Sequence, residues 1–167
     1  TDVQIVDLET GNAVLPAGEV GEIRARGPQI MAGYRNLPHE TASTLRDGWL
    51  YTGDIGEFDP DGYLFIRDRK KDMAIVGGYN VFPREIDEVL YTHPAIADAA
   101  AIGVPDDYYG EVIKAWVTLK PGTECSESDL IDFCAANLAK YKIPKSVSIG
   151  ETIPKTTVGK IDKKALR

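Results

Sequence analysis

Apolar and polar residues alternate over short stretches of the first 67 residues, and this period predicts β-strands. Residues 22–26 alternate in this way, as a strand with one buried face does. Residues 3–6 are apolar and partly β-branched, which also favours a strand. The amino-terminal part of the chain is therefore expected to form a β-sheet.

A hairpin is expected near the end of this sheet. Residues 55–58 and 63–66 have strand character, and Pro60 and Gly62 lie between them, where a tight reversal favours such residues. The helical signal before residue 67 is confined to a single turn at residues 38–45. An all-β unit is predicted.

From residue 73 onward the pattern combines strands with helices. Residues 73–76 are predicted to form a strand. Pro83 is suited to the start of a helix, because the N–H that it lacks has no partner in a first helical turn. The buried side of this helix is expected to be Ile86, Val89 and Leu90, spaced at i, i+3 and i+4.

Two paired strands and a second helix are predicted next. The strands are residues 97–104 and 112–119, and the helix begins after Ser126. Asp129 follows Ser126 by three residues, in a spacing that resembles a capping box. Cys134 lies on the expected buried side of this helix, so we interpret it as a core residue. A short strand and a loop follow at residues 146–149 and 153–160.

A run of six charged residues, 67–72, separates the two patterns. Such a run is not expected in a core, and it is typical of a linker, a sheet edge or a solvated loop. The chain is thus predicted to have an α+β fold in two units, residues 1–71 and 72–167. The first unit, at about 70 residues, is small for a complete domain. Because the chain begins at Thr1 without a methionine, we expect a piece of a longer protein.

Charge is distributed unevenly along the chain. The net charge is −7 over 167 residues, which argues against a general nucleic-acid-binding protein. Residues 72–139 have 3 basic and 12 acidic side chains, whereas residues 140–167 have 8 basic and 2 acidic ones. The basic end is either a solvated tail or a segment that meets an anion, such as a nucleotide phosphate.

Several classes of protein are excluded by what the sequence lacks. No run of about 18 apolar residues is present, so no membrane-spanning helix is expected. Cys125 and Cys134 fit no metal or redox spacing, which favours a reducing compartment, and we expect a cytoplasmic protein. The phosphate-binding P-loop, the nucleophile elbow and the common zinc motifs are absent, which argues against a self-contained hydrolase or metal enzyme. No metal site is expected within this chain.

Three segments have residues that could perform chemistry. Asp54, beside Gly53, could accept two hydrogen bonds from a ribose diol, or it could be an ordinary turn residue. In the second segment, residues 69–88, Arg69 could hold a phosphate or a ribose. Gly77 and Gly78 would permit the close approach of a ligand, although such a pair also suits a hairpin turn.

The third segment is the loop at residues 154–160, which contains a proline and a glycine and ends at Lys160. A lysine on a constrained loop can stabilise the charge that develops on a phosphoryl group in a transition state. The alternative is a surface lysine that serves solubility alone.

Taken together, these segments resemble the adenylate-forming superfamily of acyl-CoA synthetases, peptide-synthetase adenylation domains and beetle luciferases. The resemblance rests on ordered motifs that cover nearly the whole chain. They lie at residues 21–34, 51–54, 67–90 and 154–160. The resemblance implies that residues 1–71 are the β-rich end of a large domain, part of a distorted barrel, and that residues 72–167 are a small mobile α+β domain.

The resemblance also implies a reaction in two steps. A small-molecule carboxylate attacks the α-phosphate of ATP and gives an acyl-adenylate, from which the thiol of coenzyme A then displaces AMP. Asp54 and Arg69 would bind the nucleotide, and Lys160 would be the catalytic lysine of the first step. Lys71 would be a hinge between the half-reactions.

A loop for coenzyme A is implied as well. Rotation about the hinge would withdraw Lys160 and bring Gly77, Gly78 and Tyr79 to the channel for the coenzyme A thiol. Residues 69–86 are most similar to fatty-acid CoA ligases; an adenylation domain that loads a carrier protein and a non-catalytic binding module derived from this fold are the alternatives.

The family's phosphate loop, acyl pocket and Mg²⁺-binding glutamate would lie upstream of Thr1. The acid is therefore left open as fatty or aromatic. We expect the chain to need this missing amino-terminal domain as a partner and to be inactive alone.

Overall fold

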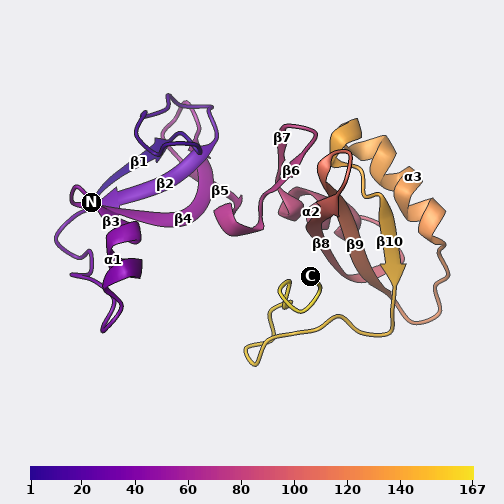
Figure 1. Ribbon diagram of the computed structural model, residues 1–167. Helices are drawn as coiled ribbons and strands as arrows, with labels where there is room; N and C mark the ends of the chain where they lie inside the picture. The colour runs from indigo at the N-terminus through magenta and orange to yellow at the C-terminus, as the bar shows by residue number, and fades with distance from the viewer. The chain divides into compact units, whose positions relative to one another are not determined.

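The computed structural model describes residues 1–167 and has an α+β fold. It divides into two compact units, Thr1–Lys71 and Asp72–Arg167, and each is described by itself (Figure 1). No helix in either unit is both long enough and apolar enough to cross a membrane.

The first unit is an antiparallel sheet with one short helix. Its strands are β1 (Asp2–Val6), β2 (Gly21–Arg26), β3 (Leu45–Arg46), β4 (Trp49–Phe58) and β5 (Leu64–Arg69), and its helix is α1 (Pro38–Thr44). The long strand β4 lies at the centre, because it pairs with β2, β3 and β5. The hairpin expected from the sequence is confirmed, although β4 begins six residues earlier than predicted. Gly62 closes its turn with a positive φ of 86°.

Buried aliphatic residues hold β1, β2 and β4 together. Ile5, Val6, Ile23 and Ile55 are nearly inaccessible to solvent. Gly21 is required at the start of β2, because a Cβ there would lie 2.2 Å from the carbonyl oxygen of Val6. The alternation over residues 22–26 predicted the strand but not its buried face, because Glu22 is buried beside Ile23 and Ala25 is only partly buried.

The charged run forms regular structure, which corrects the expectation that it lies wholly outside the core. Residues up to Arg69 complete β5, and the 3₁₀ turn η1 (Lys70–Asp72) follows. Asp68 is buried, because it lies opposite Ile55 on β4 and its carboxylate accepts the N–H of Arg69 at 2.7 Å. Strand pairing therefore outweighs the preference of a charged residue for water at this position.

The second unit is a sheet covered on one face by two helices. Its elements are β6 (Ala74–Val76), β7 (Tyr79–Val81), α2 (Pro83–Tyr91), β8 (Ile96–Asp106), β9 (Gly110–Leu119), α3 (Glu127–Asn137), η2 (Lys140–Lys142) and β10 (Ser146–Ile149). Strand β9 pairs antiparallel with β8 and parallel with β10. Strand β6 pairs with β7, and it also pairs with Gly110, the first residue of β9.

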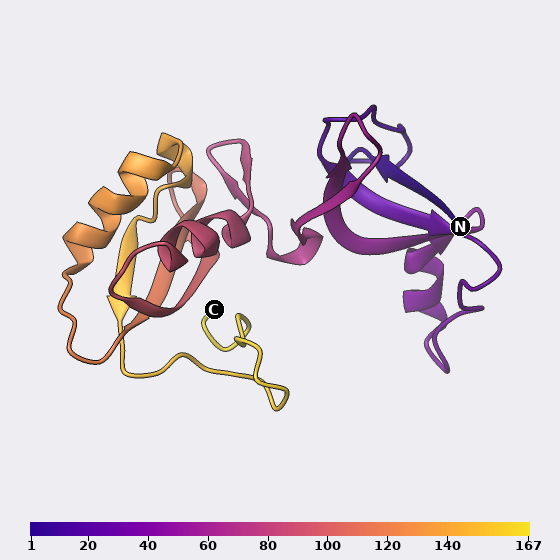
Figure 2. The same cartoon turned by 180° about the vertical axis from the view of Figure 1, so that it is seen from behind.

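Helices α2 and α3 lie against the same face of this sheet (Figure 2). Pro83 begins α2 as predicted, and Ile86 and Leu90 are fully buried, whereas Val89 is only partly buried. Ser126 caps α3, with the reciprocal bonds to Asp129 that define a capping box. That prediction is confirmed.

Cys134 is also confirmed as a core residue, since it is fully buried between α3 and the sheet. Burial raises the pKa of its thiol to about 11. The thiol therefore contributes to packing and not to reactivity.

Candidate active site

Asp54 is held on β4 by the local backbone and by the neighbouring strand. Gly53 has a positive φ of 71°, and the N–H of Asp54 donates to the hydroxyl of Thr52 at 3.1 Å. Asp54 lies directly opposite Arg69 of β5, and its Oδ1 accepts the Nε–H of Arg69 at 2.9 Å. The pair is partly open to solvent, so both side chains can exchange this contact for a ligand.

A cavity of about 480 Å³ lies beside this pair in the first unit. It is lined by Tyr34, Thr52, Gly53, Arg69, Lys70 and Lys71. Three of these side chains are cationic, which suits an anionic ligand, and Gly53 leaves its wall without a side chain. The structure thus gathers three predicted residues, Asp54, Arg69 and Lys71, at one place.

Lys70 was not singled out from the sequence, and it forms an ion pair with a buried carboxylate. Its Nζ donates to Oε2 of Glu22 at 2.8 Å, and Glu22 is buried on β2. A buried carboxylate needs such a partner. The ion pair therefore fastens the last turn of this unit, η1, to its sheet.

Lys160 lies on a closed hairpin loop near the end of the second unit. The N–H of Thr156 donates to the carbonyl of Lys160 at 2.7 Å, and the N–H of Gly159 donates to the carbonyl of Thr156 at 2.9 Å. Gly159 has a positive φ of 79°, which explains the glycine before the lysine. The loop is therefore constrained, as the sequence predicts.

Internal ion pairs account for most of the basic end of the chain. Five of its eight basic side chains bind carboxylates within the second unit: Lys142 with Glu85, Lys145 with Asp106, Lys155 with Asp98, Lys163 with Asp87, and Arg167 with Asp72. Lys140, Lys160 and Lys164 make no ion pair within the chain. Lys160 is thus an exposed, uncompensated cation on an anchored loop.

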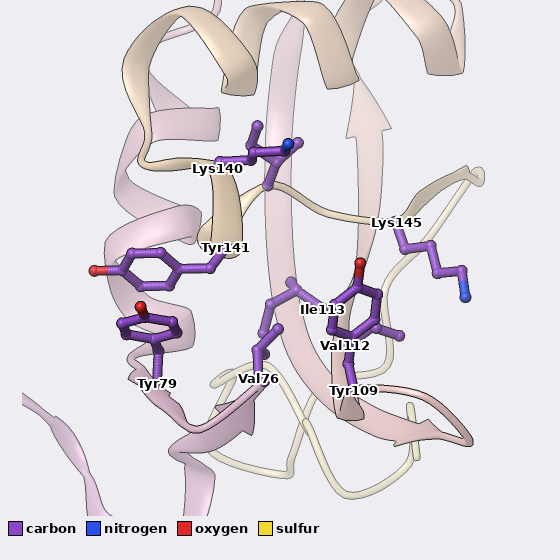
Figure 3. A pocket seen from close by; sticks show the side chains of 10 residues that line it. Val76, Tyr79, Tyr109, Val112, Ile113, Lys140, Tyr141 and Lys145 are labelled. Atoms are coloured by element: carbon purple, nitrogen blue, oxygen red, sulfur yellow. The ribbon is translucent and has the colours of Figure 1, made fainter.

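A second cavity, of about 520 Å³, opens beside the glycine loop of the second unit. Gly77 and Tyr79 line it, together with Val76, Tyr109, Val112, Ile113, Lys140, Tyr141, Ile143 and Lys145. Figure 3 shows the rings of Tyr79 and Tyr141 face to face on one side. Their centroids are 4.6 Å apart, with an angle of 19° between the planes.

The walls of this cavity are held by ion pairs and backbone bonds. Lys142 donates to both carboxylate oxygens of Glu85, at 2.7 and 2.8 Å, and so joins η2 to the first turn of α2. Asp106 accepts Lys145 Nζ at 2.6 Å and the N–H groups of Tyr108 and Tyr109 at 3.0 Å each. The hydrogen bond from Lys145 is the largest cause that lowers the pKa of Asp106 to about 2.

Only part of this cavity is predicted from the sequence. The family resemblance predicts that Gly77 and Tyr79 face a ligand. The sequence also has an excess of basic residues from position 140 onward. Tyr109 and Tyr141 could not be joined to them, because nothing in the local pattern brings the β8–β9 turn next to η2. The result is an aromatic cavity with ammonium groups from Lys140 and Lys145, which is suited to a planar ring bearing phosphates.

Metal ligands do not gather anywhere in the chain. No three His, Cys, Asp or Glu side chains lie close enough together to hold an ion. Asp54, the one carboxylate at the first cavity, is already paired with a guanidinium. The residues of this chain therefore do not fit a Mg²⁺ site.

Comparison with known proteins agrees with this geometry. Residues 85–160 match the family model described as AMP-binding enzyme C-terminal domain. The chain is 50% identical over 166 residues to a long-chain-fatty-acid–CoA ligase of Bacillus subtilis, a match that covers 99% of the chain and 30% of the ligase. It thus spans about 30% of the length of the curated relatives that it matches.

Solved structures give the same result. ATP-bound MatB from Rhodopseudomonas palustris matches with a TM-score of 0.93 and 38% identity, over 99% of this chain and 33% of MatB. MenE from Bacillus subtilis, in complex with the acyl-adenylate intermediate OSB-AMP, matches with a TM-score of 0.88 and 35% identity, over 99% of this chain and 34% of MenE.

The fold of the chain is similar to that of a region of the adenylate-forming ligases. Residues 85–160 match the AMP-binding enzyme C-terminal domain family, and the whole chain is similar to a part of such ligases.

Proposed function

We propose that the chain is part of an ATP-dependent acid–thiol ligase that activates a fatty acid as an acyl-adenylate and transfers it to coenzyme A. The observation that carries this proposal is Lys160, an uncompensated cation on a constrained loop. The names of the ligases that the chain resembles support the choice of a fatty acid.

The first cavity is proposed to bind the ribose and phosphates of ATP. A carboxylate such as Asp54 can accept two hydrogen bonds from a ribose diol, and Arg69 can bind a phosphate oxygen without losing its charge. Their mutual ion pair, at 2.9 Å, keeps both side chains oriented before the nucleotide arrives. Mg²⁺ would accompany ATP and neutralise part of the phosphate charge, held by residues outside this chain.

Lys160 is proposed to act in the first half-reaction. When the carboxylate attacks the α-phosphorus, negative charge grows on the oxygens of that phosphorus and on the departing pyrophosphate. An ammonium group fixed near these oxygens stabilises the transition state more than the ground state, and so accelerates the step. The absence of a competing carboxylate leaves the whole charge of Lys160 for this purpose.

The second cavity is proposed to hold the nucleotide end of coenzyme A. Tyr79, Tyr109 and Tyr141 offer aromatic faces for an adenine ring, and Lys140, which makes no ion pair, offers an ammonium group for its phosphates. Gly77 and Gly78 would let the pantetheine arm pass close to the backbone.

Lys71 is proposed to be the hinge between the two half-reactions, with residues 1–71 as the end of the large domain and residues 72–167 as the small mobile domain. The division of the chain into compact units on either side of Lys71 supports this assignment. Because one acyl site must serve two transition states, moving a small domain changes the catalytic groups without moving the acid.

The test is Lys160→Ala in the full-length protein, with Lys164→Ala as the control, because Lys164 is equally exposed and also lacks an ion pair. We expect ATP–pyrophosphate exchange to fall by about 10²-fold or more, as for other electrostatic groups. Thioester formation from supplied acyl-adenylate and coenzyme A should stay within about twofold of the wild-type rate. Loss of both half-reactions to the same degree would refute the role assigned to Lys160.

The isolated chain is expected to be inactive. The same exchange assay on residues 1–167 should give no rate above background, since the acyl site is proposed to lie outside it. A rate comparable with that of the full-length protein would contradict the proposal. Release of a carrier-bound product, in place of the free coenzyme A thioester, would point to the carrier-loading alternative.

A further inference from the structure

The loop that bears Lys160 is fastened to the rest of its unit on both sides by ion pairs. Lys155 lies five residues before Lys160 and Lys163 lies three residues after it. Between them the loop closes on itself, since Lys155 and Ile161 form a β-bridge and the N–H of Asp162 donates to the carbonyl of Pro154 at 2.8 Å. The loop is thus closed on itself, and the two ion pairs join its two ends to the rest of the unit.

The first ion pair joins the loop to strand β8. Lys155 Nζ donates to Oδ2 of Asp98 at 2.8 Å, and both side chains are partly exposed. Asp98 belongs to β8, and its own N–H donates to the hydroxyl of Thr118 on β9 at 3.1 Å. The carboxylate therefore stands on a fixed part of the sheet.

The second ion pair joins the loop to helix α2. Lys163 Nζ donates to Oδ2 of Asp87 at 2.6 Å, and this pair is more buried than the first, with side-chain exposures of 21% and 13%. The other oxygen of Asp87 accepts the N–H of Ala101 on β8 at 2.5 Å. A single carboxylate thus joins the helix, the edge strand and the loop.

We infer that Asp98 and Asp87, through Lys155 and Lys163, are positioning residues for Lys160 and serve the adenylation step alone. The inference rests on the proposed role of Lys160. None of these four side chains needs to touch the substrate, and their effect comes from limiting where the loop can place its ammonium group. Such placement matters because a displacement of about 1 Å can cost a large part of a rate.

The two ion pairs are expected to differ in how much they contribute to the rate of adenylation. An exposed ion pair contributes little, so breaking the Lys155–Asp98 pair should lower adenylation by about threefold. The Lys163–Asp87 pair is shielded from water, so its loss should lower adenylation by about tenfold or more.

The experiment uses the full-length protein with Lys155→Met, Asp98→Asn and Lys163→Met. Pyrophosphate exchange should fall by these factors, while thioester formation from supplied acyl-adenylate stays within about twofold of the wild-type rate. Lys155→Met and Asp98→Asn combined should be no worse than either alone, as expected for partners in one interaction. Lys163→Arg, which keeps the charge, should recover most of the exchange rate.

Glu88→Gln is the matched control. It breaks a carboxylate pair with Arg84 on the same helix, one residue from Asp87, but at an exposed position that does not reach the loop. It should leave both half-reactions unchanged.

Three outcomes overturn the inference. The first is a parallel fall of both half-reactions in Lys163→Met, which indicates general damage to the fold. The second is an unchanged exchange rate in all the loop variants while Lys160→Ala abolishes it, which refutes the positioning role but leaves the proposed function intact. If Lys160→Ala itself leaves exchange unchanged, the proposed function fails together with this inference.

Discussion

In its proposed role, Asp54 is a side chain that is oriented for a ligand before the ligand binds. Its carboxylate is partly exposed and fixed by Arg69, so its charge is available at a defined place. A hydrogen bond to a charged acceptor contributes more than one to a neutral acceptor. The value of Asp54 therefore lies in its negative charge as much as in its shape.

Asp54→Asn in the full-length protein is expected to raise the KM for ATP by about 10-fold to 100-fold, because a charged acceptor is replaced by a neutral one. The KM for the acid should change little. Steady-state kinetics with varied ATP measure the effect, and Asp61→Asn, at the exposed turn before β5, is the control. An unchanged KM for ATP would show that Asp54 does not contact the nucleotide.

The two cysteines are expected to differ in reactivity. With a pKa of about 11, only about one Cys134 thiol in a thousand is ionised at pH 8, and the residue is fully buried. Cys125 is partly exposed. Alkylation of the folded chain at pH 8 should label Cys125 alone, and both residues should react in denaturant. Rapid labelling of Cys134 in the folded chain, seen by mass spectrometry, would contradict the structure.

At the scale of single residues, sequence patterns predicted partners better than they predicted burial. Ser126 and Asp129 were recognised because a capping box is a local interaction. Asp68 was not recognised as buried, because its burial depends on its position opposite Ile55 in a neighbouring strand. A rule based on composition cannot predict which residues lie opposite each other in neighbouring strands.

Among the structural elements, the turn between β8 and β9 depends most on a single carboxylate. Asp106 accepts Lys145 and two backbone N–H groups, and these bonds lower its pKa to about 2 from an ordinary value of 3.8. A lowered pKa in the folded state means that ionisation stabilises the fold. This stabilisation is present above about pH 4 and is lost as the pH falls towards 2.

Asp106→Asn is expected to lower the thermal midpoint of the chain at neutral pH. The difference from the wild type should stay constant from pH 7 to about pH 4 and should shrink towards zero near pH 2, because the wild-type carboxylate is then protonated. Thermal unfolding followed by circular dichroism over this range measures it. A difference that persists at pH 2 would assign the effect to side-chain shape and not to charge.

Ion pairs between distant elements explain why the sequence predicts the role of the basic end only in part. The excess of lysine after residue 139 suggested either solvation or an external anion, but most of these charges meet the acidic residues of the same unit. Charge counting along the chain cannot find such pairs, since their partners are up to 95 residues apart, as in Arg167 and Asp72. What remains unpaired is therefore more informative than the total.

For the molecule as a whole, the short turn η1 is the point on which the proposed mechanism depends. Lys70 is fastened to the first unit by Glu22, and Asp72 is fastened to the second unit by Arg167. Only Lys71 lies between these two residues. A change in its backbone angles would turn one unit against the other while both ion pairs persist.

Lys71→Pro in the full-length protein should separate the half-reactions. Proline fixes φ near −65° and restricts the residue before it, so it hinders a change of conformation at this position. We expect pyrophosphate exchange within about threefold of the wild-type rate and thioester formation lower by at least about tenfold. Lys71→Ala removes the same charge but leaves the backbone free, so it should lower thioester formation no more than pyrophosphate exchange. Equal rates for the proline variant in both steps would remove Lys71 from the mechanism.

The aromatic cavity also belongs to the molecular scale. Its walls come from β6, the β8–β9 turn and η2, which are far apart in the sequence and meet only because β9 is the central strand of the second unit. The family resemblance predicted its glycine loop. The packing of Tyr79 on Tyr141 depends on the tertiary fold, which no local pattern in the sequence predicts.

One consequence of the Asp87 contact concerns solubility. Strand β8 pairs with β9 only, so its other edge presents backbone groups that could join a strand from another molecule. Asp87 accepts the N–H of Ala101 at this edge, and the loop binds Asp98 of the same strand through Lys155. Loosening the loop is expected to make this edge more accessible to a strand of another molecule, so the segment that is proposed to position Lys160 is also expected to limit aggregation.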